Sequence, residues 1–231
     1  MTGAPAEVRY VGREKVPVLA VEARALGADK MAEAAPTRPF AANGIHYPGV
    51  RAAAPGGYAR MLAQALAGPV GEMMGWKDAE LGVVASDFSL VTTPPADLTP
   101  IQRIPHFDGT DEGVIAVLHY LCGPDWGGTA FFRHKVTGFE RVTGPRAARY
   151  DEVLRADVRT HGLPDAAYVD GDTPIFEETA RYEARFGRLL AYPGNALHSG
   201  RIPAGRTLPA DPARGRLTVN TFLRRMPGRG G

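Results

Sequence analysis

Cysteine, net charge and long apolar runs are all scarce in this sequence. Its 231 residues include one cysteine, Cys122, so no disulfide can form within the chain. The formal net charge is only +2, which gives no electrostatic reason to expect nucleic acid or a membrane surface as a partner. No apolar run approaches the ~20 residues that a membrane-spanning helix needs. We therefore expect a reducing, cytoplasmic setting without membrane or nucleic-acid partners.

Glycine and proline, by contrast, are abundant, with 28 and 20 residues. This composition is typical of many turns between short strands, and a hydrophobic content of 44% is enough for a buried core. We expect a single domain over 1–231 that is mainly β with flanking helices, with a double-stranded β-helix (jelly roll) at its core. Residues 1–80 are expected to form a support of helix and strand, and residues 81–223 the jelly-roll core with an insertion at 140–187.

Local patterns predict the individual elements. Apolar residues at helical spacing predict the clearest helix over 57–75. The nearly continuous apolar run at 114–121 predicts a central strand, buried on both faces. Other strands are predicted at 15–22, 81–93, 102–108, 129–134, 186–192 and 217–224, and other helices at 22–34, 145–157 and 174–185.

Two histidines and one aspartate form a candidate metal site. His106 and Asp108 lie in the run Ile-Pro-His-Phe-Asp-Gly, and His198 lies in Pro-Gly-Asn-Ala-Leu-His-Ser. Residues i and i+2 of a strand point to the same face, so His106 and Asp108 can reach one metal ion. A distant His198 can complete the set of two histidines and one carboxylate that holds non-haem Fe(II) and leaves coordination positions open. His134, at the end of a predicted strand, is a rival ligand.

An arginine opens the last predicted strand. Arg216 precedes Leu-Thr-Val-Asn-Thr-Phe, and a charged group at the start of a buried strand needs an acceptor because unpaired burial is costly. Its planar fork suits the two oxygens of a carboxylate. Thr218, two residues on and on the same face, could add a hydroxyl to the same carboxylate. Arg206 and Arg214 compete with Arg216 for this role.

The order of these motifs resembles that of the Fe(II)/2-oxoglutarate-dependent oxygenases, most closely their prolyl-hydroxylase-like branch. The resemblance extends over residues 87–223 without the insertion. A His-x-Asp pair is followed by VLHYL at 117–121, by GGTAFF at 127–132, by a distal histidine and by an arginine that opens a strand. The loop at 201–214 and the insertion at 140–187 are both longer than is usual in that branch.

The resemblance implies a cofactor set and a reaction. Fe(II) would bind His106, Asp108 and His198, and the co-substrate 2-oxoglutarate would chelate the metal with its far carboxylate on Arg216 and the Tyr120 hydroxyl. O2 would be the oxidant, and hydroxylation of a substrate C–H bond would release succinate and CO2. Halogenating relatives lack the carboxylate that Asp108 supplies, so the resemblance favours hydroxylation or a related oxidation such as desaturation.

Two other functions fit the same fold class or ligand set. The chain could be a non-catalytic or cupin-like metal-binding jelly-roll protein, since a fold does not fix a function. It could also be a zinc hydrolase, because two histidines and a carboxylate can hold catalytic zinc; Glu112 is then the nearest candidate general base. The substrate could be a small molecule or a peptidyl residue, and the charged insertion with the arginine-rich loop favours a polar or anionic one. The oligomeric state is left open.

Overall fold

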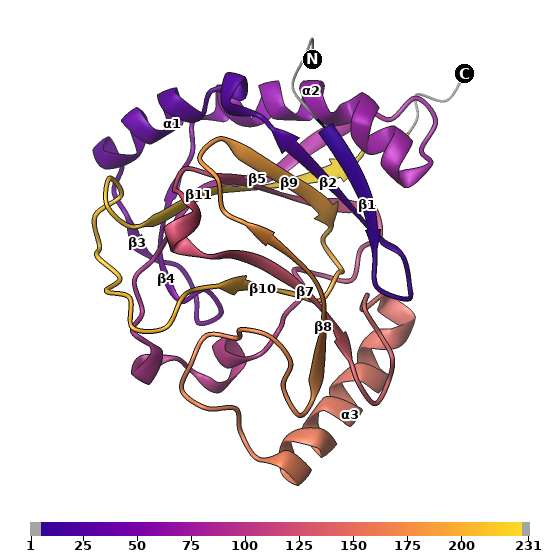
Figure 1. The fold of residues 1–231 in the computed structure, drawn as a ribbon. Coiled ribbons are helices and arrows are strands. Elements are labelled where there is room, and N and C mark those ends of the chain that lie inside the picture. The colour runs from indigo at the N-terminus through magenta and orange to yellow at the C-terminus, as the bar shows by residue number, and fades with distance from the viewer. Residues whose placement is uncertain (1–5, 228–231) are drawn as a thin grey trace.

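The computed structural model describes residues 6–227, so both ends of the expected domain lie outside the described part. Two antiparallel sheets face each other and three helices lie outside them (Figure 1). The architecture confirms a mainly β fold with flanking helices and a jelly-roll core. The larger sheet contains β1 (Ala6–Val11), β2 (Val16–Glu22), β3 (Ala41–Ala42), β4 (Gly49–Ala53), β5 (Leu81–Val91), β6 (Val114–Tyr120), β9 (Arg188–Pro193) and β11 (Arg216–Arg225).

The larger sheet has the strand order β1-β2-β9-β6-β11-β5-β4-β3. Its centre is β6, which carries the continuous apolar run predicted for a central strand and is buried along almost its whole length. One face of β6 points outward to the helices through Ile115 and Val117. The other face points inward to the smaller sheet through Ala116, Leu118 and Tyr120. The two-residue period of the strand thus divides one apolar run between two cores.

Two helices cover the outer face of the larger sheet, along the top of Figure 1: α1 (Ala28–Ala34) and α2 (Gly56–Met74). The buried residues of α2 recur every three or four positions, as expected of a helix that packs one face on a sheet; they include Leu62, Leu66, Val70 and Met73. No helix in the described part of the chain is long and apolar enough to cross a membrane.

The smaller sheet has the order β10-β7-β8, formed by β7 (Gly128–His134), β8 (Phe176–Glu183) and β10 (His198–Arg201). Helix α3 (Gly144–His161) packs on the outer side of this sheet, where Tyr150 and Leu154 pack with Phe132 and Phe176. The division of the chain at 80 and the status of 140–187 as an insertion stay predictions, but this segment supplies one strand of the smaller sheet.

Several expected elements differ from those observed. The helix predicted at 174–185 is wrong, because its residues form β8 and pair with β7; backbone pairing and the burial of Phe176 and Tyr182 override the helical preference of its Glu, Ala and Arg residues. The helix predicted at 22–34 begins only at Ala28, after Gly27 with its positive φ of 88°. Strands β1, β3, β4 and β10 were not predicted from the sequence.

The strand predicted at 102–108 is also wrong over its first half. Pro100–Arg103 form a short 3-10 helix, which Thr99 and Gln102 stabilise by a capping box. Only His106 pairs with another strand, through an isolated bridge to His198. Other short 3-10 helices are Arg24–Leu26, Ala35–Thr37, Pro95–Asp97 and Pro124–Trp126.

Candidate metal centre and its cavity

The three predicted metal ligands come together at one edge of the smaller sheet. His106 and His198 exchange two backbone hydrogen bonds, each of 2.8 Å. The Asp108 backbone N–H donates to the Gly194 carbonyl at 2.8 Å, which anchors the other end of the His-x-Asp segment. Residues 92 positions apart in the chain are thus held side by side by main-chain pairing.

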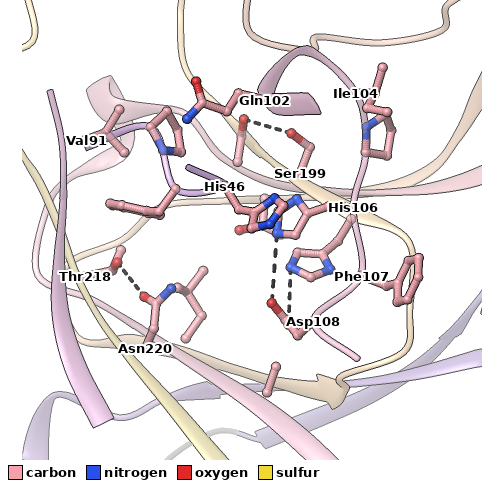
Figure 2. A pocket seen from close by; sticks show the side chains of 18 of the residues that line it. His46, Val91, Gln102, Ile104, His106, Phe107, Asp108, Ser199, Thr218 and Asn220 are labelled. Carbon is pink, nitrogen blue, oxygen red and sulfur yellow. Dashed lines mark hydrogen bonds and ion pairs between the residues drawn. The ribbon is translucent and has the colours of Figure 1, made fainter. Parts of the chain in front are cut away.

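The side chains of these residues converge on one point. The distance from His106 Nε2 to Asp108 Oδ1 is 3.9 Å and that from His198 Nε2 to Asp108 Oδ2 is 3.7 Å (dashed in Figure 2). One ligand atom from each residue lies within 4.8 Å of the other two. The His198 Nδ1 donates to the Ala196 carbonyl at 2.9 Å, so Nε2 keeps its lone pair free for a metal. This donor set fits an ion such as Fe(II).

The electrostatics of the triad also fit a bound cation. Burial lowers the pKa of His106 well below its ordinary value, and the neighbouring His198 and Arg51 lower it further. Burial raises the pKa of the Asp108 carboxyl. The pocket therefore favours the neutral imidazole of His106, which is the form that binds metals. A divalent ion would add positive charge beside the Asp108 carboxylate.

The triad opens into a cavity of about 580 Å³ between the two sheets. Figure 2 shows His106, Asp108, Thr218 and Asn220 directed into it. Among the described lining residues Asp108 is the only carboxylate, whereas two arginines, Arg51 and Arg216, line the same space. The volume suits a small organic ligand.

Arg216, the predicted carboxylate-binding residue, lines this cavity. It opens β11 and is only 4% exposed. Its Nε donates to the Trp126 carbonyl at 3.3 Å and its Nη2 to the Gly128 carbonyl at 2.7 Å. No ion pair joins Arg216 to a carboxylate within residues 6–227, so a buried cation with three further N–H donors faces the cavity. The rivals Arg206 and Arg214 are exposed, and Arg206 packs over the Trp126 ring.

The Gly127-Gly128 pair explains how the Trp126 and Gly128 carbonyls come close to Arg216. Gly127 has a φ of +77°, and a side chain there would collide with the Arg201 carbonyl. A side chain on Gly128 would collide with the Tyr182 carbonyl across the sheet. Only glycine therefore lets the chain enter β7 so closely between its neighbours.

Tyr120 and Thr218 occupy different positions relative to the cavity. Thr218 lines it and donates through Oγ1 to Asn220 Oδ1 at 2.7 Å. Tyr120 is fully buried behind the wall, where its hydroxyl lies 2.6 Å from Thr129 Oγ1. Burial raises the pKa of Tyr120 to about 12, so its phenol stays protonated. Thr129, not Tyr120, is the member of this pair that lines the cavity.

Other histidines lie outside the triad. His134, the rival ligand, is fully buried; its Nδ1 lies 2.9 Å from Thr137 Oγ1 and its Nε2 lies 3.1 Å from Asp157 Oδ2 on α3. His119 points to the opposite face of β6 from Tyr120, where its Nδ1 is hydrogen-bonded to the Tyr58 hydroxyl of α2 at 2.6 Å. Neither residue lines the cavity.

Sequence reasoning missed three residues that face the same space. Tyr192 packs against His198 with ring centroids 4.9 Å apart, and burial together with Asp108 raises its pKa well above the ordinary value. Tyr47 and Arg51 enter from the loop before β4 and from β4 itself. The signal for Arg51 was a lone arginine in the apolar run Gly-Val-Arg-Ala-Ala, which is the same kind of signal that identified Arg216.

Comparisons with known proteins add a family and a fold. A family model described as a family of unknown function, DUF6445, matches residues 3–223. A search of curated proteins finds no match. Among solved structures, HygX from Streptomyces hygroscopicus with nickel and 2-oxoglutarate bound is similar at 10% identity and a TM-score of 0.51, over 92% of this chain and 84% of that one.

Two further structures are similar. The non-haem α-ketoglutarate-dependent epimerase SnoN of nogalamycin biosynthesis matches at 14% identity and a TM-score of 0.50, over 94% of this chain and 88% of that one. A prolyl-4-hydroxylase from Pseudomonas putida matches at 14% identity and a TM-score of 0.42, over 97% and 94%. The resemblance to the Fe(II)/2-oxoglutarate-dependent oxygenases is thus confirmed at the level of the fold.

Proposed function

This chain belongs to DUF6445, a family of unknown function, and we propose that it is an Fe(II)- and 2-oxoglutarate-dependent oxygenase. The observation that carries the proposal is the shared cavity of the His-Asp-His triad and a buried arginine without a carboxylate partner in the described chain. The first provides a metal site and the second provides a counter-charge for an acid. The fold shared with HygX and SnoN, at identities of 10% and 14%, agrees with this combination.

We assign His106, Asp108 and His198 as the ligands of Fe(II). The Ala196 carbonyl fixes the tautomer of His198, and the main-chain bridge between the two histidines fixes their spacing. Asp108 supplies the single negative charge of the set. When bound, Fe(II) with 2-oxoglutarate and O2 would supply the oxidation of a substrate C–H bond, with release of succinate and CO2.

We assign the far carboxylate of 2-oxoglutarate to Arg216. The carbonyls of Trp126 and Gly128 hold the guanidinium in place before the ligand arrives, which lowers the entropic cost of binding. Thr129 and Thr218 add hydroxyls on the cavity wall, and Tyr120 positions Thr129 from behind through its own hydroxyl. The protein thereby binds, orients and shields the co-substrate.

The alternative functions are less well supported. A zinc hydrolase needs a general base near the metal, but Glu112 is exposed and does not line the cavity. A cupin-like binding protein needs no arginine opposite the metal, whereas Arg216 is buried in this position. The cavity volume of about 580 Å³ favours a small-molecule substrate over a long peptide.

Anaerobic titration of the metal-free protein with Fe(II) and then 2-oxoglutarate tests the proposal. Bidentate chelation should give a weak visible charge-transfer band that needs both components and is absent in His198→Ala. Bound metal without this band would count against a 2-oxoglutarate site and return the cupin-like and hydrolase alternatives.

A further inference from the structure

Arg51 is a second cation in the cavity that the assignment of Arg216 leaves unused. It lies on β4, in register with Ser89 of β5, which in turn pairs with Thr218 of β11. Residues in such a row share a face of the sheet, so Arg51 points to the same side as Thr218. Arg216 belongs to a different row, with Val91 and Gly49.

The two arginines extend from different strands and from different rows of the sheet. Two strand spacings separate β4 from β11, roughly 10 Å, and two residues along the strand add about 7 Å in the other direction. The sheet thus presents two arginines from separate backbone positions. One co-substrate carboxylate on the metal and one on Arg216 leave Arg51 without an anion.

The Arg51 guanidinium has one buried N–H group without a partner. It stacks over the Tyr47 ring at 4.4 Å, which fixes its orientation. Its Nε is buried and has no hydrogen-bond partner within the described chain. A buried donor without a partner is costly, so this place on the cavity wall suits a ligand that accepts a hydrogen bond.

No protein carboxylate neutralises Arg51. It lines the same cavity as Asp108 and His106, yet it forms no ion pair with any acid of residues 6–227. The charge of Asp108 would be used by the metal. An arginine held by an aromatic ring, near the metal and without a counter-ion, is suited to a ligand carboxylate.

Part of the cavity wall is aliphatic or aromatic. Its lining includes Ile101, Ile104, Phe107, Tyr150, Leu154 and Tyr168, beside polar residues such as Gln102 and Ser199. An acid bound to Arg51 would therefore lie with its body among aromatic and aliphatic side chains. We propose that Arg51 binds a carboxylate of the molecule to be oxidised, and that the substrates are small organic acids with an apolar body. This inference rests on the proposed function and names its substrate class.

A matched pair of probes tests the inference: 3-phenylpropionate and the neutral 3-phenylpropionamide. Each is titrated by anaerobic calorimetry into protein loaded with Fe(II) and saturating 2-oxoglutarate. We expect wild type to bind the acid at least about tenfold more tightly than the amide, as for a charge-assisted hydrogen bond. Arg51→Gln should lose this preference and Arg51→Lys should keep part of it.

Arg206→Gln is the matched control, because it removes one positive charge from an exposed side chain outside the cavity. It should keep the full preference for the acid. A wild-type protein that binds the acid no better than the amide, including one that binds neither, overturns the inference. So does an Arg51→Gln variant in which the preference persists.

The visible band of Fe(II) with 2-oxoglutarate separates this inference from the function on which it rests. Arg51→Gln should keep the band and its dependence on 2-oxoglutarate, which also shows that the variant has folded. Loss of the band in Arg51→Gln but not in Arg216→Gln would make Arg51 the co-substrate residue and overturn the inference while the oxygenase function stands. Absence of the band in wild type would overturn the proposed function itself.

Discussion

His106 and His198 face each other across an isolated main-chain bridge, with two hydrogen bonds of 2.8 Å and ring centroids 4.4 Å apart. The spacing of the two imidazoles is therefore set by backbone groups that survive any change of side chain. Removing one imidazole should abolish metal binding and leave the fold intact, because the bridge needs only the peptide groups.

His106→Ala should weaken Fe(II) binding by more than about a hundredfold, beyond the usual cost of losing only a residue that supports a ligand. Anaerobic metal titration measures this affinity, and circular dichroism checks that the variant is folded. His46→Ala is the control, since His46 lines the cavity but is not one of the three clustered ligands. Unchanged affinity in the His106 variant would contradict the assigned triad.

Arg216→Gln should weaken 2-oxoglutarate binding by about a hundredfold, because a buried charge-assisted pair is lost. Titration of the Fe(II)-loaded protein with 2-oxoglutarate gives the dissociation constant. Arg206→Gln and Arg214→Gln remove the same charge from exposed positions and should bind normally. The reverse pattern would transfer the role to the loop of residues 201–214.

Tyr120→Phe and Thr129→Val should each weaken 2-oxoglutarate binding by roughly fivefold, the usual effect of one lost hydrogen bond. Their hydroxyls lie 2.6 Å apart, and Tyr120 is expected to act through Thr129. The double variant should then be little worse than either single one, which a double-mutant cycle measures. Fully additive losses would mean that the two hydroxyls act separately.

The free energy of unfolding should decrease as the pH is lowered, over the pH range between the folded and unfolded pKa values of His119. Burial lowers the pKa of His119 to about 4 in the folded protein, against about 6.5 in an unfolded chain. The unfolded state therefore binds the extra proton first, and stability is full above pH 6.5 and declines toward pH 4. The loss attributable to His119 amounts to about 3 kcal/mol at most.

Urea unfolding at a series of pH values measures this decline. His119→Gln should flatten it, although the variant loses the hydrogen bond with Tyr58 and is less stable at neutral pH. His161→Gln, at the exposed end of α3, is the control and should keep the wild-type slope. An unchanged slope in the His119 variant would contradict the assigned window.

Much of the fold could be read from local patterns. The apolar run of β6, the helical spacing of α2 and the strand that follows Arg216 appear where the sequence predicts them. Strands β3, β4 and β10 were missed because they are short. Strand β1 was missed because only its last residue, Val11, is buried. The sequence of β8 has helix-forming residues, and only its pairing with β7 makes it a strand.

The sequence by itself determined the chemistry available to this protein. It indicated which residues can bind a metal, which arginine opens a buried strand, and that the two glycines Gly127 and Gly128 begin a strand. Residue types and spacings suffice for this because they limit what each side chain can bind. Only the tertiary structure decided which groups meet. It joined His198 to His106, placed Thr129 in front of Tyr120, and brought Arg51 from β4 into the cavity. Such contacts depend on pairing between distant strands, which no local pattern records.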